Sequence, residues 1–392
     1  MTFDEVINRR ATESYKWREY PEDVMPLFVA DMDFRSPEAV ARALRAYIGD
    51  GVFGYPRGLH TYDHAQLHEL SGLVVDRMAH RYNWQIGVDD VVLIPGVVAG
   101  LNITCHSFAA NSSLRQRSVV VQPPVYPPIL GAPLNAHLQR VESPLQCEND
   151  GSYSVDWDSF RSGVAQNAGL FVLCNPHNPV GRVFRRDELE RMAEICLSAN
   201  IKICADEIHS DLLFDSHEHI PIASLDPEIA RQTITLIAPS KTFNLAGLQC
   251  GFAIISNSEL RQQFRSAREG LVPWVNAMGL IGAEAAYRDG QSWLDQLLAY
   301  LHANREFLSD FVRREMPEIR MRKPEGTYLA WLDCRELKVD SPYEFFLQHA
   351  RVALNDGRTF GTGGTGFVRL NFGCPRSILE EALSRMKLSL AA

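Results

Sequence analysis

The stretch Ile237-Ala-Pro-Ser-Lys-Thr-Phe-Asn-Leu-Ala-Gly-Leu-Gln-Cys-Gly251 decides the fold. It continues an apolar run that predicts a buried strand over residues 233–238, and it places Ser240 and Lys241 just beyond that strand. A lysine amine whose pKa is depressed by its surroundings can form a Schiff base with an aldehyde cofactor. The neighbouring serine hydroxyl can hold the phosphate of such a cofactor. A surface Ser-Lys pair is the alternative, and the polar residues upstream argue against it.

Two of those upstream residues also stand where apolar runs end. Asp206 follows the run 201–205, and a carboxylate there is costly unless a cation or a hydrogen-bond donor faces it. A pyridinium nitrogen is such a partner, and the ion pair keeps that nitrogen protonated, which makes its ring an electron sink. A structural ion pair with an arginine is the alternative. Asn175 follows the run 170–174 and opens a proline-rich turn, where its amide could donate to the phenolic oxygen of the ring.

Two residues match the needs of a flat ring and an amino-acid substrate. Tyr126 lies in Pro-Pro-Val-Tyr-Pro-Pro, where a rigid aromatic side chain could stack on a ring. Arg369 lies in the apolar run 367–370, where an arginine needs an anionic partner, and its planar fork matches a substrate carboxylate. A loop-packed tyrosine and a structural ion pair are the respective alternatives.

The segment Gly96-Val-Val-Ala-Gly100 predicts the start of a helix that extends to residue 108. Free N–H groups and the helix dipole make such a start suitable for a phosphate group. Ser240 would add a hydroxyl to the same phosphate. Glycine-rich helix starts are common, so this segment indicates a phosphate site only together with the other motifs.

The order of apolar and amphipathic segments predicts an α/β fold. Strand-like runs separated by helices favour a mostly parallel sheet covered on both faces, with ligands beyond the carboxyl ends of its strands. From about residue 285 the pattern changes to a long helix, further strands and a closing helix, which indicates a smaller α+β domain. The predicted strands of the large sheet cover 91–95, 118–122, 170–174, 201–205, 233–238 and 251–255, and the later elements cover 291–314, 327–332, 367–370 and 376–390.

Composition excludes several classes of function. The chain has 392 residues, 46% of them hydrophobic and 22% charged, as in ordinary globular proteins. Its net charge is 39 − 48 = −9, which argues against nucleic acid or an anionic membrane as a partner. The eight cysteines show no metal-ligand spacing, so we expect no metal site. Without a signal peptide or a membrane-spanning run, we expect a cytoplasmic protein.

Together these motifs resemble those of fold-type I pyridoxal-phosphate (PLP) enzymes over essentially the whole chain. Within that group the chain is similar to the MalY/PatB branch of cystathionine β-lyases, also called C–S lyases. The resemblance implies a mostly parallel seven-stranded sheet in a large PLP-binding domain, residues 51–285, and a small α+β domain made of 1–50 and 286–392. It is carried by Phe28-Val-Ala-Asp-Met-Asp-Phe34, Phe53-Gly-Tyr-Pro56, Asp206-Glu-Ile-His-Ser-Asp211, Ser240–Gln249, Leu354-Asn-Asp-Gly357 and Arg369-Leu-Asn-Phe372.

The resemblance also implies roles for single residues. Tyr55 would reach the phosphate in the neighbouring subunit, which implies a homodimer with shared active sites. The roles within one chain are Schiff-base lysine for Lys241, ring-nitrogen partner for Asp206, ring-oxygen contact for Asn175, phosphate contacts for Val97, Val98 and Ser240, ring stacking for Tyr126, and binding of the substrate's α-carboxylate for Arg369. Asn175 and Tyr126 would also contact the substrate.

Two positions depart from the aminotransferase pattern. His209, expected among the cofactor contacts, stands where many aminotransferases carry a tyrosine near the ring oxygen. Gln249 stands where they carry an arginine that binds phosphate. Both departures agree with the C–S lyase branch, whose reaction is β-elimination from an L-cysteine thioether to thiol, pyruvate and ammonia. An aminotransferase on the same scaffold and a PLP-fold protein with a regulatory binding role remain alternatives.

Overall fold

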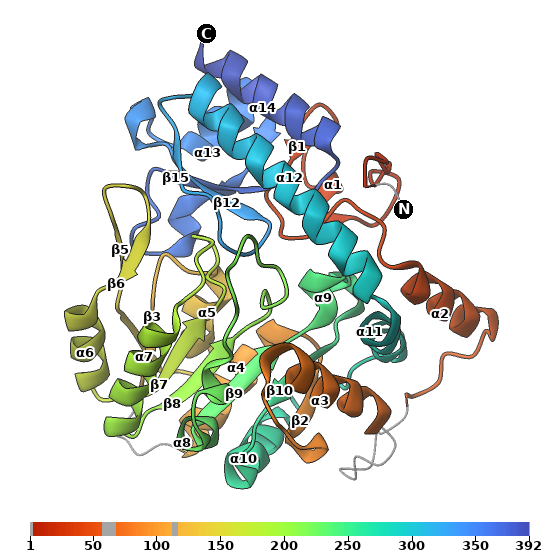
Figure 1. The fold of residues 1–392 in the computed structure, drawn as a ribbon, viewed down its shortest axis with the longest axis vertical. Coiled ribbons are helices and arrows are strands. Elements are labelled where there is room, and N and C mark those ends of the chain that lie inside the picture. Colours follow the sequence, from red (N-terminus) through yellow and green to blue (C-terminus); the bar gives the residue numbers. More distant parts are fainter. Residues whose placement is uncertain (1–2, 57–67, 112–116, 392) are drawn as a thin grey trace.

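The computed structural model describes residues 3–56, 68–111 and 117–391. Its largest sheet has seven strands in the order β2-β10-β9-β8-β7-β3-β4, which occupies the lower part of Figure 1. β10 is antiparallel to both of its neighbours, and the other neighbouring strands are parallel, so the predicted mostly parallel sheet is confirmed. The strands are β2 (Val91–Ile94), β3 (Ser118–Val121), β4 (Gln139–Glu142), β7 (Ala168–Cys174), β8 (Lys202–Asp206), β9 (Thr233–Ile237) and β10 (Gly251–Ile254).

The edge strand β4 is the one strand of this sheet that the sequence pattern did not predict. Its residues, Gln-Arg-Val-Glu, bury only Val141 and expose or half-expose the others. An edge strand needs few apolar residues, because it pairs on one side only. The pattern therefore has no long apolar run at this position.

Helices cover both faces of the sheet, as the alternation of segments predicted. One face packs against α4 (Val97–Asn111), α5 (Pro127–Asn135) and α10 (Ser258–Arg268). The opposite face packs against α6 (Trp157–Ala165), α7 (Arg186–Ser198), α8 (Pro227–Arg231) and, near β2 and β10, α3 (His68–Tyr82). Strand side chains alternate between these two clusters, because successive residues of a strand point to opposite faces. Leu170 and Val172 of β7 thus belong to the first cluster, and Phe171 and Leu173 to the second.

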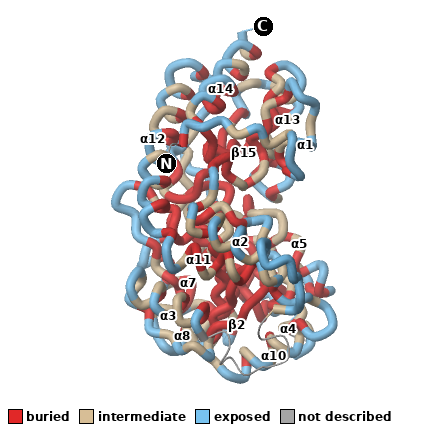
Figure 2. Tube along the Cα trace, turned by 90° about the vertical axis from the view of Figure 1, so that its right-hand side faces the viewer, coloured by how far each residue is buried: buried red, intermediate tan, exposed pale blue. Residues whose placement is uncertain are grey.

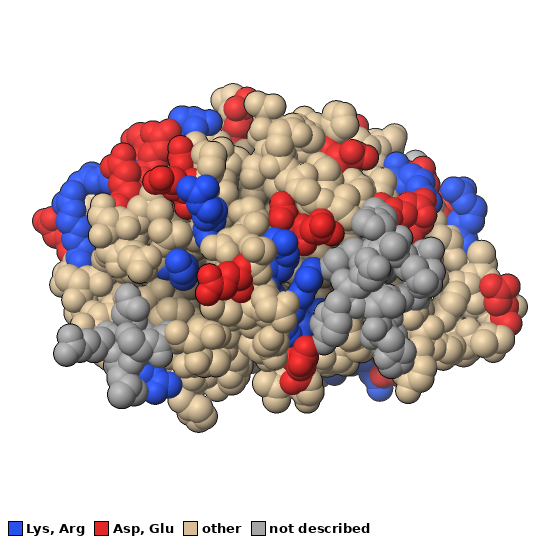
Figure 3. Space-filling view, turned by 90° about the horizontal axis from the view of Figure 1, so that it is seen from below, with Lys and Arg blue, Asp and Glu red and all other residues tan. Residues whose placement is uncertain are grey.

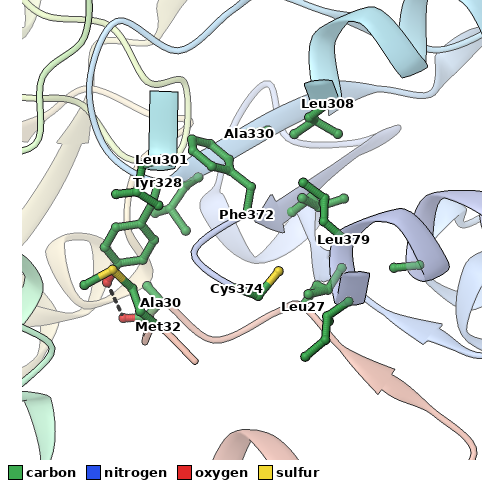
Figure 4. Close-up of a cluster of buried hydrophobic side chains, with 14 of the residues drawn as sticks. Leu27, Ala30, Met32, Leu301, Leu308, Tyr328, Ala330, Phe372, Cys374 and Leu379 are labelled. Carbon is green, nitrogen blue, oxygen red and sulfur yellow. Dashed lines mark hydrogen bonds between the residues drawn. The ribbon is translucent and has the colours of Figure 1, made fainter. Parts of the chain in front are cut away.

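A second, antiparallel sheet lies above the first in Figure 1, in the order β11-β12-β15-β14. Its strands are β11 (Arg320–Met321), β12 (Leu329–Asp333), β14 (Asn355–Asp356) and β15 (Phe367–Asn371). The long helix α12 (Gln291–Glu315) and the closing helix α14 (Arg376–Leu390) pack on it. Figure 4 shows part of that core, where Phe372, Leu308 and Leu379 meet. Figure 2 shows buried residues in two zones, one around each sheet.

The N-terminal segment is tied into this second part of the molecule. β1 (Met25–Pro26) pairs in parallel with β13 (Val352–Ala353).

Every strand of the large sheet lies within 51–285, and every strand of the four-stranded sheet lies within 286–392. These positions are consistent with the predicted division into two domains, which stays a prediction. The remaining elements are α1 (Tyr15–Arg18), α2 (Glu38–Gly49), β5 (Leu145–Cys147), β6 (Tyr153–Val155), α9 (Pro239–Thr242), α11 (Ala277–Asp289), α13 (Pro342–Phe345) and several short 3-10 or π turns.

Within the described ranges, no helix is long and apolar enough to span a bilayer. On the face shown in Figure 3, basic and acidic side chains are interspersed rather than gathered by sign. That distribution offers no extended basic surface on this face.

Candidate active site

A cavity of about 480 Å³ opens beyond the carboxyl ends of β7, β8 and β9. This is the place where ligands bind in open parallel sheets. Its walls bring together residues that lie far apart in the sequence. The predicted site residues that line it are Val97, Val98, Tyr126, Asp206, His209, Ser240 and Lys241, and the additional lining residues include Ala30, Asn102, Cys174, Asn178 and Gln249.

Lys241 lies in the short helix α9, which follows β9. Its Nζ donates a hydrogen bond of 2.6 Å to the carbonyl oxygen of Ala30. The hydroxyl of Tyr328 donates to the same oxygen over 2.9 Å, a contact drawn in Figure 4. Loss of hydration and the charge of Arg369 lower the pKa of Lys241 to about 8. The neutral, nucleophilic amine is therefore accessible near neutral pH.

Asp206 is the last residue of β8, and only 3% of its surface is exposed. One of its carboxylate oxygens accepts a hydrogen bond from the backbone N–H of Ile208 over 3.2 Å. Burial raises the pKa of Asp206 to about 7, although the hydrogen bond from Ile208 and the charge of Lys241 act in the opposite direction. Among the described residues, no lysine or arginine forms an ion pair with Asp206. The structural alternative of an Asp206–arginine pair is therefore excluded for this part of the chain. A buried carboxylate of this kind fits a ligand that brings its own cation.

Arg369 lies on β15 and is 3% exposed. Its guanidinium donates to the carbonyl oxygen of Phe28 over 2.8 Å and to the side-chain oxygens of Asn178 and Asn355 over 3.0 and 2.8 Å. Its Nε, also buried, has no hydrogen-bond partner. All three partners are neutral, and burial lowers the pKa of Arg369 to about 10. A buried cation without a counter-charge fits an anionic substrate group.

Three segments of the cavity wall offer hydrogen-bond donors. Val97 and Val98 form the start of α4, whose first backbone N–H groups have no partner within the helix. Ser240 and Gln249 lie on the facing wall, and Gln249 has the left-handed φ of 51°. The arrangement offers N–H and hydroxyl donors without a fixed cation, and therefore suits a phosphate group.

His209 and Tyr126 complete the walls. His209 is 2% exposed, and its ring packs edge-on against Tyr328 with ring centres 6.0 Å apart. Burial, together with the charges of Lys241 and Arg369, holds the pKa of His209 well below its usual value, so the ring is neutral. Its Nδ1 is buried without a partner. A buried polar atom of this kind suits a polar ligand in the cavity.

The structure places one of the predicted contact residues away from the cavity wall. Asn175 is fully buried and does not line the cavity, whereas Asn178 of the same turn does. The reason is the alternation of strand side chains: Cys174 and Asp206 pair across β7 and β8 and both reach the cavity, so Asn175 points to the opposite face of the sheet. Sequence reasoning therefore missed Asn178. Both asparagines lie in the same proline-rich turn, so residue type alone could not have separated them.

Tyr55 does not reach the cavity of its own chain. It is 88% exposed and lies beside a separate surface hollow with Phe53, Asn276 and Met278. This position agrees with a residue that acts outside its own subunit, but it does not test that role. Among the described residues, no group of three His, Cys, Asp or Glu side chains could hold a metal ion.

The sheet, the cavity and its lysine together define a class of protein. The Aminotransferase class I and II family matches residues 22–386, and the chain belongs to this family. Its fold is that of the fold-type I PLP enzymes, and its cofactor is pyridoxal 5′-phosphate. The residues present fit that group, since Asp206 forms no ion pair with a lysine or arginine of the described ranges and the start of α4 offers free N–H groups.

Individual relatives narrow the class to the PatB/MalY type. The chain is 37% identical over 401 residues to the cystathionine β-lyase PatB of Bacillus subtilis (strain 168), covering 100% of both proteins. It is 41% identical to OvoB, whose crystal structure it matches with a TM-score of 0.92 over 100% of both chains. It is 33% identical to cystalysin from Treponema denticola, with a TM-score of 0.91 over 100% of this chain and 98% of cystalysin. The cystalysin crystal structure contains pyridoxal 5′-phosphate.

Proposed function

We propose that the protein is a C–S lyase that performs β-elimination on L-cysteine thioethers such as cystathionine, giving thiol, pyruvate and ammonia. The observation that carries the proposal is the similarity to the cystathionine β-lyase PatB over the full length of both proteins. The site supports it, because Lys241 and the carboxylate of Asp206 line one cavity, and the buried guanidinium of Arg369 lies close enough for its charge to lower the pKa of Lys241. We further propose that the protein acts in the cytoplasm.

Lys241 is the residue that moves the proton. Bound pyridoxal phosphate supplies an electron sink next to the Cα atom of the substrate. Lys241, whose pKa is lowered to about 8, accepts the Cα proton as general base. The carbonyl oxygen of Ala30 orients the amine before the transfer. The electron pair left on Cα then forms a double bond to Cβ and expels the thiolate, which is a good leaving group.

Asp206 and Asn178 hold the ring, in our proposal. The buried carboxylate of Asp206 keeps a proton on the ring nitrogen, because burial makes an unpaired carboxylate costly. The side-chain oxygen of Asn178 accepts from Arg369, so its amide group is left to donate to the ring oxygen. Tyr126 stacks on the ring, and the neutral His209 contributes a further polar contact.

Arg369 binds the α-carboxylate of the substrate. Its three neutral partners fix the plane of the guanidinium without neutralising it. A substrate carboxylate can then match both the positive charge and the planar geometry of the Arg369 guanidinium. This contact places Cα near Lys241, which is the arrangement that proton transfer needs.

We propose that the active form is a homodimer. Large apolar side chains are exposed near Tyr55, which would reach the phosphate bound to a second copy. Such exposure is unusual for the surface of a monomer. The exposed fractions are 72% for Val52, 65% for Phe53, 88% for Tyr55 and 39% for Met278.

The test is direct. The purified protein with pyridoxal phosphate is incubated with cystathionine or S-alkyl cysteines while thiol and pyruvate are measured. The proposal expects both products in equal amounts, without added keto acid. Amino transfer from alanine or aspartate to a keto acid, with no thiol from any thioether, would instead assign an aminotransferase.

A further inference from the structure

A buried polar cluster lies on the face of the sheet opposite the cavity, directly behind Asp206. It consists of Asn175, Glu207 and His219, whose exposed fractions are 0%, 1% and 5%. His219 stands between the other two: its Nε2 lies 2.9 Å from a carboxylate oxygen of Glu207, and its Nδ1 lies 3.5 Å from the amide nitrogen of Asn175. The proposed reaction assigns no role to any of the three.

The direction of each hydrogen bond follows from the backbone around the cluster. The side-chain oxygen of Asn175 accepts from the N–H of Phe184 over 3.1 Å, so its amide nitrogen faces His219. An amide nitrogen can only donate, and Nδ1 of His219 must therefore accept. The ring proton then sits on Nε2 and is donated to Glu207. The other oxygen of Glu207 accepts from the N–H of Ile222 over 3.1 Å.

The cluster lies there because of strand alternation. Asp206 reaches the cavity, so the next residue, Glu207, points to the reverse face, as Asn175 does on the neighbouring strand. The N–H of Asn175 also donates to the carbonyl oxygen of Asp206 over 3.0 Å. His219, which comes from a separate loop, joins these two strand ends. Its ring is covered by Tyr82, edge-on at 5.4 Å.

We propose that His219 and Glu207 are positioning residues for the cofactor site. His219 and Glu207 act on the end of β7, and on the turn that carries Asn178, through Asn175. They act on the end of β8, which carries Asp206, through the backbone. The negative charge of Glu207 also contributes to the raised pKa of Asp206. The cluster thus sets both the place and the basicity of the group that meets the ring nitrogen. Outer partners of this kind commonly change affinity or activity about tenfold or more when removed.

Three substitutions at His219 separate the two contacts. His219→Asn keeps an acceptor at the position of Nδ1 and loses the contact with Glu207. His219→Gln keeps a donor toward Glu207 and loses the acceptor that faces Asn175. His219→Phe removes both contacts and fills similar space. The dissociation constant for pyridoxal phosphate and the visible absorption spectrum of the bound cofactor are measured for each, with the thermal midpoint alongside.

Glu207→Gln tests the other end of the cluster. A glutamine has one oxygen, so it cannot accept from both His219 and the N–H of Ile222. The control is Glu188→Gln, because Glu188 is also buried, at 5% exposure, and forms an ion pair with Arg182. One oxygen of Glu188 accepts from that arginine and from the N–H of Arg185, so the substitution removes a buried charge and can keep both hydrogen bonds. Both substitutions remove one buried carboxylate, and only one of them lies behind Asp206.

The expected result is a dissociation constant for pyridoxal phosphate raised roughly tenfold in His219→Gln, His219→Phe and Glu207→Gln, with an altered spectrum. His219→Asn should stay within about threefold of the unsubstituted protein, since Asn175 keeps its acceptor. Glu188→Gln should lower the thermal midpoint without changing cofactor affinity or spectrum.

The proposal is overturned if all four variants at His219 and Glu207 bind the cofactor with unchanged affinity and spectrum and lose only thermal stability. It is also overturned if Glu188→Gln changes the spectrum as much as Glu207→Gln does.

NMR of the protein with ¹⁵N-labelled histidine rings is a second measurement, in which His219 must show an unprotonated Nδ1 and a protonated Nε2. The inference rests on the cofactor contacts of the proposed function. None of its readings requires lyase activity, so a failed lyase assay would leave the test intact.

Discussion

At the scale of single residues, Lys241 differs from an ordinary lysine because it combines burial with a neighbouring cation. Its pKa is lowered to about 8, and only the neutral amine can attack the aldehyde of the cofactor. The rate at which cofactor-free protein takes up pyridoxal phosphate should therefore rise with pH through about 8 and level off above it. Stopped-flow absorbance measures this rate. A rise that continues unchanged beyond pH 10, as for a solvent-exposed lysine, would contradict the lowered pKa.

Covalent attachment at Lys241 is a separate prediction at the same scale. Borohydride reduction of the protein with bound cofactor should fix the cofactor on the peptide that contains Lys241, as peptide mass spectrometry would show. Lys241→Ala should bind the cofactor without a covalent bond and lose turnover, because the Cα base is absent. Cofactor fixed on a different lysine would refute the assignment.

Arg369 should affect the substrate much more than the cofactor. Removing one member of a buried charge pair costs about 2–5 kcal/mol, since the other charge is left unpaired. Arg369→Ala should therefore lower kcat/KM for cysteine thioethers by about a hundredfold or more, mainly through KM. The dissociation constant for pyridoxal phosphate serves as the control and should change little. An unchanged KM would remove Arg369 from the substrate site.

At the scale of elements, the position of α4 depends on one close approach. A Cβ atom added at Gly100 would lie 2.7 Å from a methyl carbon of Ile94 and 2.9 Å from one of Leu236. The helix rests closely on the sheet at this point, and the ends of the Ile94 and Leu236 side chains, both buried, must move before a Cβ atom fits at residue 100. α4 also begins at the wall of the cavity, so its distance from the sheet bears on the cofactor.

Gly100→Ala should therefore destabilise the fold and weaken cofactor binding together. Overpacking of this kind costs about 1–3 kcal/mol of unfolding free energy. Urea unfolding of the cofactor-free protein measures the first effect, and the dissociation constant for pyridoxal phosphate measures the second. Gly131→Ala in α5 is the control, since an added Cβ there meets no atom within 4 Å. Equal behaviour of the two variants would show that the close approach relaxes without cost.

At the scale of the whole molecule, the exposed apolar side chains near Tyr55 predict association. Phe53 is 65% exposed, and a charge at its position should oppose burial against a second copy. The unsubstituted protein should sediment as a dimer, whereas Phe53→Glu should shift it toward monomer and weaken cofactor binding. Tyr55→Phe should keep the dimer and lose only the phosphate contact, seen as a raised dissociation constant for pyridoxal phosphate. A monomeric unsubstituted protein with a full complement of cofactor would contradict the shared site.

The sequence by itself determined the class of fold and the cofactor. Apolar runs that end in Asp206 and in Ser240-Lys241 mark the carboxyl edge of a parallel sheet, because such strands all end on one side. The order of these motifs along the chain was sufficient for the family, which the comparison with known proteins confirms. Burial of these groups followed from the hydrophobicity of their neighbours, which a sequence displays directly.

Only the tertiary structure decided which of two asparagines meets the cavity and what stands behind Asp206. Asn175 and Asn178 lie in one turn and have the same chemistry, so the choice depends on strand register and on the path of the turn. His219 approaches Asn175 and Glu207 from a loop with no motif of its own. The neutral partners of Arg369 likewise come from three segments far apart in the chain. Contacts between distant segments arise from packing of the whole chain, which local patterns of residue type do not encode.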